Sequence, residues 1–254
     1  MTAEKQHIRP WAVAVWLLIW QLGSMAMAWA YPHGSILLAS PVQSALRLLD
    51  LGATGAFWRT IAWSSVRIFG GYLLACALGV VLAALSARFR RLRELMAPAV
   101  AAIKAIPVVS FIILVLVFLD ARQLPLFIAG LMVFPPIYLN TLTAILHTDP
   151  ALLEMARVYR VPLSRRLWGI YLPAVLPQFR AAASLALGLC WKSGVAAEVI
   201  GLPTGSIGEQ LYSAKVYFLT PDLFAWTAVI MTVSVLFEKL FLAVLDRLVR
   251  KAGC

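Results

Sequence analysis

Long apolar runs constrain this chain more than any other feature of its sequence. They cover residues 11–30, 60–86, 97–119, 124–146, 177–200 and 223–245. A helix of about 20 residues crosses a hydrocarbon core that is roughly 30 Å thick, so each run is long enough to span a membrane. The runs lack the apolar–polar alternation of transmembrane β-strands. The sequence therefore predicts an all-α polytopic membrane protein with six transmembrane helices.

The charge of the chain agrees with this prediction. Charged residues make up only 13% of the sequence, whereas soluble domains carry roughly 25%. The net charge of +11 raises nucleic-acid binding as an alternative. However, the basic residues lie at the ends of the apolar runs, where they set membrane topology. We therefore expect membrane lipid around the chain and no nucleic-acid partner.

The first apolar run could also be a signal peptide, because Ala28-Trp29-Ala30 resembles a cleavage site. Signal cores are usually about 7–15 residues long, and this run is longer, so we expect an uncleaved helix. Two other runs contain prolines that disfavour a straight helix, namely Pro98 and Pro107 in one and Pro135-Pro136 in the next. We expect kinks or breaks there.

The distribution of basic residues predicts the orientation of the chain. Six spans place both termini on one side, and most of the Lys and Arg residues fall on that side: Lys5, Arg9, Arg88, Arg90, Arg91, Arg93, Arg157, Arg160, Arg165, Arg166, Arg180, Arg247, Arg250 and Lys251. Only Arg47, Arg59, Arg122 and Lys215 fall on the other side. Because cytoplasmic loops carry the excess of Lys and Arg, we expect cytoplasmic N- and C-termini and a cytoplasmic loop at 147–173.

This loop contains a predicted short amphipathic helix. Asp149 is a suitable N-cap, and Pro150 is tolerated in the first helical turn. At helical spacing, an apolar face contains Leu152, Met155, Ala156, Val158 and Tyr159. The opposite face contains Glu154, Arg157 and Arg160, with Leu153 among them. Such a helix is suited to contact a partner outside the membrane, although it could also be a surface helix whose arginines only fix topology.

The spacing of residues in the loop resembles that in permease subunits of binding-protein-dependent ABC importers. That family has Glu-Ala-Ala, three residues, Gly, nine residues, Ile, one residue and Leu-Pro. This chain matches the pattern at Glu154, Ala156, Ile170, Leu172 and Pro173, while Met155 and Arg160 replace Ala and Gly. Further motifs resemble the nitrate, sulfonate and taurine branch of the family: Thr60, Ser64-Ser65, Arg67, Gly70, Gly79, Asn140-Thr141, Asp149-Pro150, Ala196-Ala197-Glu198 and Gly201.

The resemblance implies a type I importer permease fold, with residues 1–254 as one transmembrane domain in the bacterial inner membrane. It also implies that residues 151–161 form a coupling helix that docks into a cytoplasmic ATPase. The coupling residues would be Leu152, Leu153, Glu154, Met155, Ala156, Arg157, Tyr159 and Arg160. Glycine at the position of Arg160 would permit a left-handed turn; we expect Pro162 to end the helix by a different route here.

Charged residues inside predicted spans are costly and tend to be functional. Arg67 and Glu198 both lie in the outer halves of their spans, where they could pair structurally or line the solute path. Lys192 lies near mid-span and could either attract an anionic solute in a central cavity or pair with a neighbouring helix. Lys104 is expected near the cytoplasmic end of its span, with its ammonium reaching the interface.

The family resemblance completes the functional prediction. It implies a second permease copy, two ATPase subunits that bind ATP and Mg²⁺, and an extracytoplasmic solute-binding protein. The branch that this chain resembles handles small, often anionic solutes such as sulfonates, taurine and nitrate, and also some pyrimidine-type vitamin precursors. We expect a small anionic solute that crosses by alternating access. The chain itself has no phosphate-binding G-x-x-x-x-G-K-[ST] motif, no metal-ligand spacing and no catalytic constellation.

Two other classes of protein remain as alternatives at this point. An ion-gradient secondary transporter would need buried acidic groups, for which only Glu198 and Glu238 are candidates. Its usual inverted repeats are also absent from the sequence pattern. A membrane-embedded enzyme would need a polar cluster at one depth of the membrane, and the sequence shows none.

Overall fold

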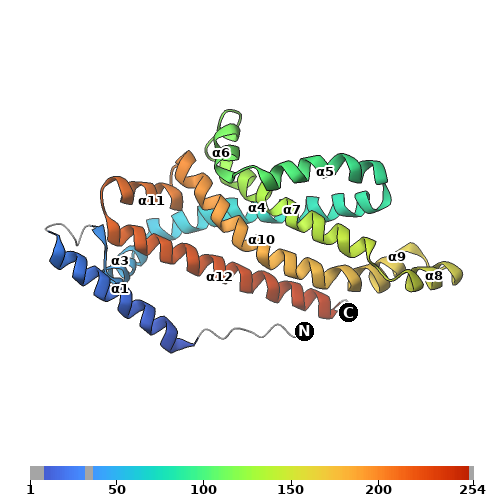
Figure 1. The fold of residues 1–254 in the computed structure, drawn as a ribbon, viewed down its shortest axis with the longest axis horizontal. Coiled ribbons are helices and arrows are strands. Elements are labelled where there is room, and N and C mark those ends of the chain that lie inside the picture. The colour runs from blue at the N-terminus through green and yellow to red at the C-terminus, as the bar shows by residue number, and fades with distance from the viewer. Residues whose placement is uncertain (1–8, 32–36, 252–254) are drawn as a thin grey trace.

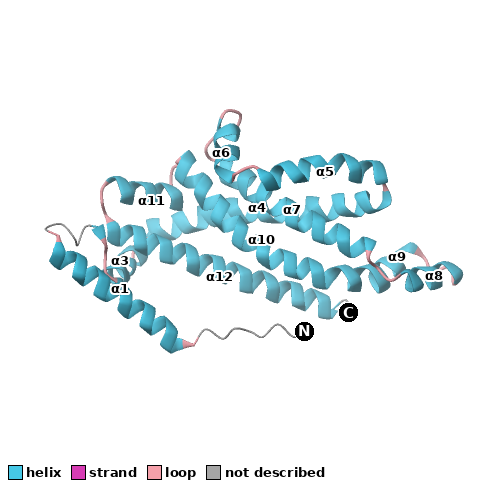
Figure 2. Cartoon of the chain, in the orientation of Figure 1, coloured by secondary structure: helices cyan, strands magenta, loops and turns pink. Residues whose placement is uncertain are grey.

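The computed structural model of the chain describes residues 9–31 and 37–251, the last four by their backbone alone. In these residues the regular elements are helices joined by short turns (Figure 2). The helices are α1 (Pro10–Ala30), α3 (Pro41–Gly52), α4 (Gly55–Arg88), α5 (Arg90–Ala105), α6 (Val108–Leu116), α7 (Leu124–Leu146), α8 (Pro150–Val158), α9 (Leu163–Arg166), the π-helix η1 (Leu167–Tyr171), α10 (Leu172–Gly201), α11 (Ile207–Val216) and α12 (Thr220–Lys251).

The long helices have the length and composition of membrane spans. Five segments of the described chain qualify alone, and the bent pair α5 and α6 makes a sixth if it counts as one span. One of the five runs without interruption from Leu163 to Gly201, through α9, η1 and α10. The prediction of an all-α polytopic membrane protein is confirmed.

The core of the bundle lies around α7, which packs between α4 and α10 (Figure 1). Gly71 allows α4 and α7 to approach closely, because a Cβ atom there would lie 2.2 Å from the backbone oxygen of Leu126. Large side chains of α4 and α10 fill the remaining space, with Tyr72, Leu187 and Trp191 almost fully buried. Small residues thus determine the helix spacing, as is common in membranes.

The third predicted span is broken rather than straight. α5 and α6 meet at an angle of 103°, with Pro107 as the residue before α6. Pro98 lies inside an uninterrupted α5, and Pro135-Pro136 lie inside an uninterrupted α7, so only Pro107 marks a break. Because α5 begins at Arg90, Lys104 is about 21 Å along it. Lys104 lies in the last turn of α5, next to the break, and its position relative to the cytoplasmic end stays a prediction.

Two short helices cover the end of the bundle at which α4 begins. Helix α3 starts with a capping box, in which Ser40 and Gln43 each accept a hydrogen bond from the other's backbone N–H. It is held to α12 by Arg47, whose Nη2 donates to Asp222 Oδ2 at 3.0 Å. This hydrogen bond raises the pKa of the Arg47 guanidinium. Helix α11 was not predicted; it lies within residues 201–222, which several Gly and Pro residues interrupt.

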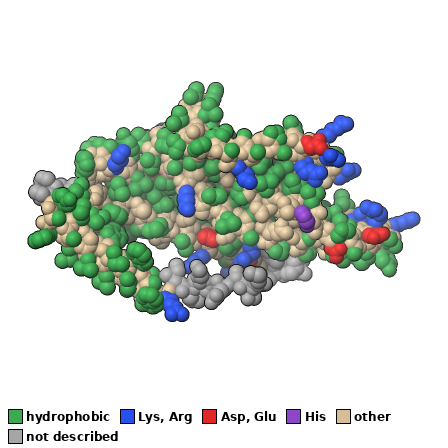
Figure 3. All heavy atoms as spheres, in the orientation of Figure 1, with side chains coloured by type: hydrophobic (Ala, Val, Ile, Leu, Met, Phe, Trp, Pro, Cys, Tyr) green, Lys and Arg blue, Asp and Glu red, His purple; other side chains and the backbone are tan. Residues whose placement is uncertain are grey.

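Basic side chains gather at the opposite end of the molecule, where α4 ends and α8 lies (Figure 3). Some of these residues also make specific contacts. Arg180 of α10 donates from Nε and Nη2 to the two carboxylate oxygens of Asp246 in α12, at 2.7 and 3.0 Å. This bidentate pair joins the two helices near the basic end. Arg180 therefore does more than contribute to topology.

Candidate functional site

Helix α8 forms as the sequence predicts. The carboxylate of Asp149 accepts a hydrogen bond from the backbone N–H of Ala151 at 2.9 Å, and Pro150 occupies the first turn. Ala156 is fully buried against the rest of the chain. The Ala156 carbonyl accepts a hydrogen bond from Arg166 Nη2 at 3.2 Å, so this side of α8 faces the segment that follows it.

Most of the predicted apolar face of α8 has no partner in the described chain. Leu152 and Met155 are 43% and 46% exposed, and Val158 and Tyr159 are more than 70% exposed. Glu154 and Arg157 are exposed beside them. An apolar surface with a charged rim is the composition of a protein-binding face.

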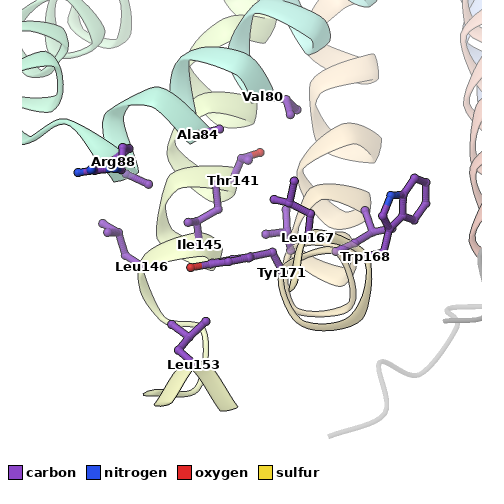
Figure 4. Close-up of a pocket in the computed structure, with 13 residues that line it drawn as sticks. Val80, Ala84, Arg88, Thr141, Ile145, Leu146, Leu153, Leu167, Trp168 and Tyr171 are labelled. Carbon is purple, nitrogen blue, oxygen red and sulfur yellow. The ribbon is translucent and has the colours of Figure 1, made fainter. Parts of the chain in front are cut away.

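Leu153 points to the bundle, contrary to the helical-wheel assignment that placed it with Glu154 and Arg157. It lines a pocket of about 690 Å³ between α4, α7, α8 and η1. Figure 4 shows Leu153 below Ile145 and Tyr171, while Arg88 lies at the α4 side. Ala156, three residues further along this nine-residue helix, is also buried, so the inward side of α8 includes Leu153.

Arg160 adopts the left-handed backbone conformation, with φ of +49°. The backbone N–H of Val161 donates to the carbonyl of Ala156 at 2.9 Å, and that of Arg160 donates to Arg157 at 3.1 Å. These two bonds form a Schellman motif, a common helix ending in which glycine usually occupies the left-handed position. The expectation that Pro162 would replace this turn was wrong: the turn is kept, with arginine in it.

Arg166 holds the exit of α8, a role that the sequence analysis missed. Its Nε donates to the carbonyl of Val161 at 2.8 Å, and its Nη2 donates to the carbonyl of Ala156 at 3.2 Å. These are carbonyls at and just after the end of α8, where basic side chains are favoured. Only the count of basic residues had drawn attention to Arg166.

The apolar surface continues from α8 into the segment that leads to α10. Leu163, Leu167 and Trp168 are between 50% and 68% exposed. The π-helix η1 joins α9 to α10 without a break in the backbone. The segment from Leu163 to Gly201 is therefore one continuous helical segment that begins just after the turn following α8.

Glu198 is fully buried at the opposite end of the bundle. Its Oε2 accepts hydrogen bonds from Ser64 Oγ at 2.9 Å and from the backbone N–H of Gly208 at 3.1 Å. Ser64 Oγ in turn accepts from the N–H of Ile207 at 2.9 Å. The carboxylate thus lies at the N-terminus of α11, where the helix dipole stabilises negative charge, and joins α4, α10 and α11.

Arg67 and Glu198 lie in this same half of the molecule, but they do not form an ion pair within 4 Å among the described residues. The Arg67 guanidinium lies over the Trp63 ring, 5.7 Å from its centroid. Lys192 is exposed on α10 and has no ion pair in the described residues. The structure therefore brings Arg67 and Glu198 to one region and leaves Lys192 apart from them.

No group of three or more His, Cys, Asp or Glu side chains suited to a metal ion occurs in the described residues. Cys76 and Cys190 are buried free thiols in the core, and Cys190 Sγ donates to the carbonyl of Ile68 at 3.3 Å. These cysteines act as small packing residues. The functional candidates are thus α8 with its flanking turn and the polar region near Glu198.

Comparison with known proteins gives one family match. Residues 75–251, more than half of the chain, match the family described as binding-protein-dependent transport system inner membrane component. The matched region contains α8 and its flanking turns and most of the helical core.

Individual relatives match over most of their length. A Bacillus subtilis protein named as an aliphatic sulfonates transport permease, SsuC, is 27% identical over 238 residues, which cover 92% of this chain and 82% of the relative. The bicarbonate transport system permease protein CmpB of Synechococcus elongatus is 28% identical, covering 91% of this chain and 84% of its own. The Escherichia coli protein that is also named as an aliphatic sulfonates transport permease, SsuC, is 28% identical, and the match covers 84% of this chain and 80% of the relative.

Proposed function

This chain belongs to the family of binding-protein-dependent transport system inner membrane components, and from that premise we propose that it imports a small oxyanion by alternating access. It is a multi-pass inner membrane protein and the permease subunit of an ABC importer. It is not an enzyme, since ATP hydrolysis in such importers takes place in a partner ATPase. A substrate-binding protein is the other partner that the family implies.

The proposed solute class rests on the relatives and on the charges of the chain. The names of the relatives refer to aliphatic sulfonates and bicarbonate, which are small anions with several oxygen atoms. Arg67 and Lys192 are basic residues within the helices, and neither forms an ion pair in the described residues. We propose that both attract the anion along its path, and that taurine and nitrate belong to the same solute class.

We propose that α8 and its flanks, residues 147–173, form the coupling element on the cytoplasmic side. The observation that carries this proposal is the exposed apolar face of Leu152, Met155 and Tyr159 at the basic end of the molecule. Since basic loops remain in the cytoplasm, that end would face the ATPase. Glu154 and Arg157 would contact its rim, and the exposed Arg160 would extend the same docking surface into the turn.

The proposed mechanism follows from how α8 is attached. ATP and Mg²⁺ bind the ATPase subunits, whose closure displaces the docked α8. Ala156 and the Arg166 hydrogen bonds keep α8 fixed to the turn that follows it. The displacement therefore reaches α10 through η1 and opens the path to the outside; hydrolysis restores the inward-facing state.

We further propose that two copies of residues 1–254, each a single permease domain, form the path between them. Two ATPase subunits would bind the two copies of α8, and membrane lipid would surround the assembly. One copy leaves many apolar side chains of α1, α4 and α12 exposed, which is consistent with contact to lipid and to a second copy.

The coupling proposal is tested with charge changes on α8. In the complex co-expressed with its ATPase, Glu154→Arg and Met155→Glu should each reduce the co-purified ATPase by about tenfold or more, because an interface charge without a partner costs over 1.4 kcal/mol. Glu94→Arg is the matched control, because Glu94 is exposed at the same end and its one ion pair within the described residues is with Arg90. Normal ATPase retention and normal solute-stimulated hydrolysis in both α8 variants would contradict the proposal.

The solute proposal is tested separately, in proteoliposomes that contain the complete importer. Uptake of ethanesulfonate and of bicarbonate is measured with the cognate binding protein in the solution outside the proteoliposomes. Import of at least one oxyanion is expected. Import of neutral or cationic solutes alone would contradict the proposed solute class but not the family assignment.

A further inference from the structure

A pocket of about 380 Å³ lies at the end of the bundle opposite α8. It is lined by α4, by the turn between α6 and α7, and by the turn between α10 and α11. Its basic residues are Arg59, Arg67 and Arg122, and its other side chains include Thr60, Trp63 and Thr204. We call it the arginine pocket.

The arginines of the pocket form no ion pair within 4 Å among the described residues. Two carboxylates lie nearby: Glu198 interacts electrostatically with Arg67, and Glu209 accepts a hydrogen bond from the N–H of the lining residue Gly205. Asp120 lines an adjacent recess together with Arg122 and Thr204, but lies beyond ion-pair distance of Arg122. A cleft lined by one sign of charge concentrates ions of the opposite sign.

Arg67 is positioned to accept a ligand in this pocket. Trp63, which also lines the pocket, lies against its guanidinium at 5.7 Å. One guanidinium nitrogen, Nη1, is buried and has no hydrogen-bond partner. Buried donors without partners are costly and rare in proteins. A small rotation of the guanidinium that brings Nη1 to the pocket would allow an anion oxygen to supply the missing partner.

The polar network around Glu198 fixes one wall of the pocket. Glu198 accepts hydrogen bonds from Ser64 and from the N–H of Gly208, which hold the start of α11. The turn that carries Thr204 lies between α10 and α11 and is fixed at both ends by this network. The Glu198 carboxylate thus shapes the wall and does not line the pocket.

We propose that the arginine pocket is an entry site for the transported anion, at which a sulfonate or carboxylate-type oxyanion binds before it moves along the path. The planar guanidinium forks suit two oxygens of one anion, and the hydroxyls of Thr60 and Thr204 can donate to a third. The volume fits a small organic ion. This inference rests on the proposed oxyanion import and adds the site of entry.

A small anion fits the pocket better than an acidic side chain of a docking protein. The lining is concave, and the unpartnered nitrogen of Arg67 is buried rather than exposed on a flat surface. A flat basic rim would instead favour protein carboxylates. Docking of the binding protein through these arginines is therefore the result that would contradict the proposal.

The test uses the permease–ATPase complex in nanodiscs, with Thr204→Cys as a reporter and Cys254→Ser in the background. Thr204 is exposed, and its cysteine thiolate reacts with alkyl methanethiosulfonates to form a mixed disulfide and release methanesulfinate. The sulfonatoethyl reagent is anionic and the trimethylammonioethyl reagent is cationic. Each rate is divided by the rate of the same reagent with a small free thiol. The normalised rate of the anionic reagent should exceed that of the cationic reagent by about tenfold or more, because the pocket concentrates anions.

Two controls separate the pocket from the general charge of the molecule. Ala53→Cys lies exposed at the same end but outside the pocket, and should show no such preference. Arg67→Gln and Arg122→Gln should each reduce the preference at Thr204→Cys several-fold, and ethanesulfonate should slow the modification only when the arginines are present. Arg122 lies in an exposed turn, so its variant is informative even if Arg67→Gln fails to fold.

An equal preference at Ala53→Cys, or a preference that survives both glutamine substitutions, would overturn the proposal. So would protection by ligand-free binding protein without protection by ethanesulfonate. Because modification is measured without ATP, its outcome is independent of transport. Anion preference without oxyanion import would contradict the proposed solute, whereas oxyanion import without anion preference would contradict only this entry site.

Discussion

The two ends of the helical bundle hold their turns in different ways. Near Glu198 the turn between α10 and α11 is fixed by buried contacts between distant segments, such as Ser64 with Glu198. At the α8 end the turn is fixed by bonds between neighbours, such as Arg166 with Ala156 and Val161. The first turn depends on the whole fold, whereas the second keeps its own shape and leaves an apolar face exposed for a partner.

The largest effect is expected at Gly208, where a side chain would break the buried contacts. A Cβ atom there would lie 2.3 Å from Glu198 Cβ and 2.4 Å from its backbone carbon. Gly208→Ala should destabilise the fold by about 3 kcal/mol or more, because neither atom can move without shifting α10. Thermal unfolding in detergent measures it. Gly188→Ala is the control, since nothing lies within 4 Å of that Cβ position.

Removal of the Glu198 carboxylate should have the next largest effect. Glu198→Ala leaves the Ser64 hydroxyl and the Gly208 N–H without their acceptor and should cost about 2–3 kcal/mol. Glu198→Gln keeps an acceptor oxygen and should retain most of the stability. If both variants unfold at the wild-type temperature, the buried network does not hold this end.

A local effect is expected at Arg166. Arg166→Gln removes two hydrogen bonds to the exit of α8 and should cost about 1 kcal/mol of local stability, with the unfolding temperature of the bundle unchanged. Hydrogen exchange of the α8 amides measures it, and coupled ATP hydrolysis should fall in parallel. Arg165→Gln is the neighbouring control. Equal exchange in the two variants would contradict the role of Arg166.

The smallest effect is expected at Arg160, and it should be stabilising. Its left-handed backbone costs a non-glycine residue roughly 1–2 kcal/mol, of which the greater freedom of unfolded glycine offsets a part. Arg160→Gly should therefore slow amide exchange in α8 slightly. Arg157→Gly, inside the helix, should accelerate exchange, because glycine disfavours helix interiors by about 1 kcal/mol. A faster exchange in Arg160→Gly would show that its side chain makes a compensating contact.

The features that depend on local sequence could be predicted, and those that depend on distant pairs could not. Apolar runs indicated the membrane helices, and Asp149 with Pro150 indicated the start of α8. The left-handed turn at Arg160 was missed because its residue type disfavours that conformation. The bond between Ser64 and Glu198 joins residues 134 apart, so no local pattern indicates it. Leu153 was misassigned because only the packed bundle determines which side of α8 faces inward.

The break between α5 and α6 has a consequence for how the subunit sits among lipids. Ala105, Ile106 and Pro107 are exposed. Helix α5 begins at the basic end and ends at this break, about 24 Å along its own axis. Backbone groups released by such a break cannot face acyl chains, which offer no hydrogen bonds. The surface of one copy is therefore divided into a side that faces lipid and a side that must contact water or protein.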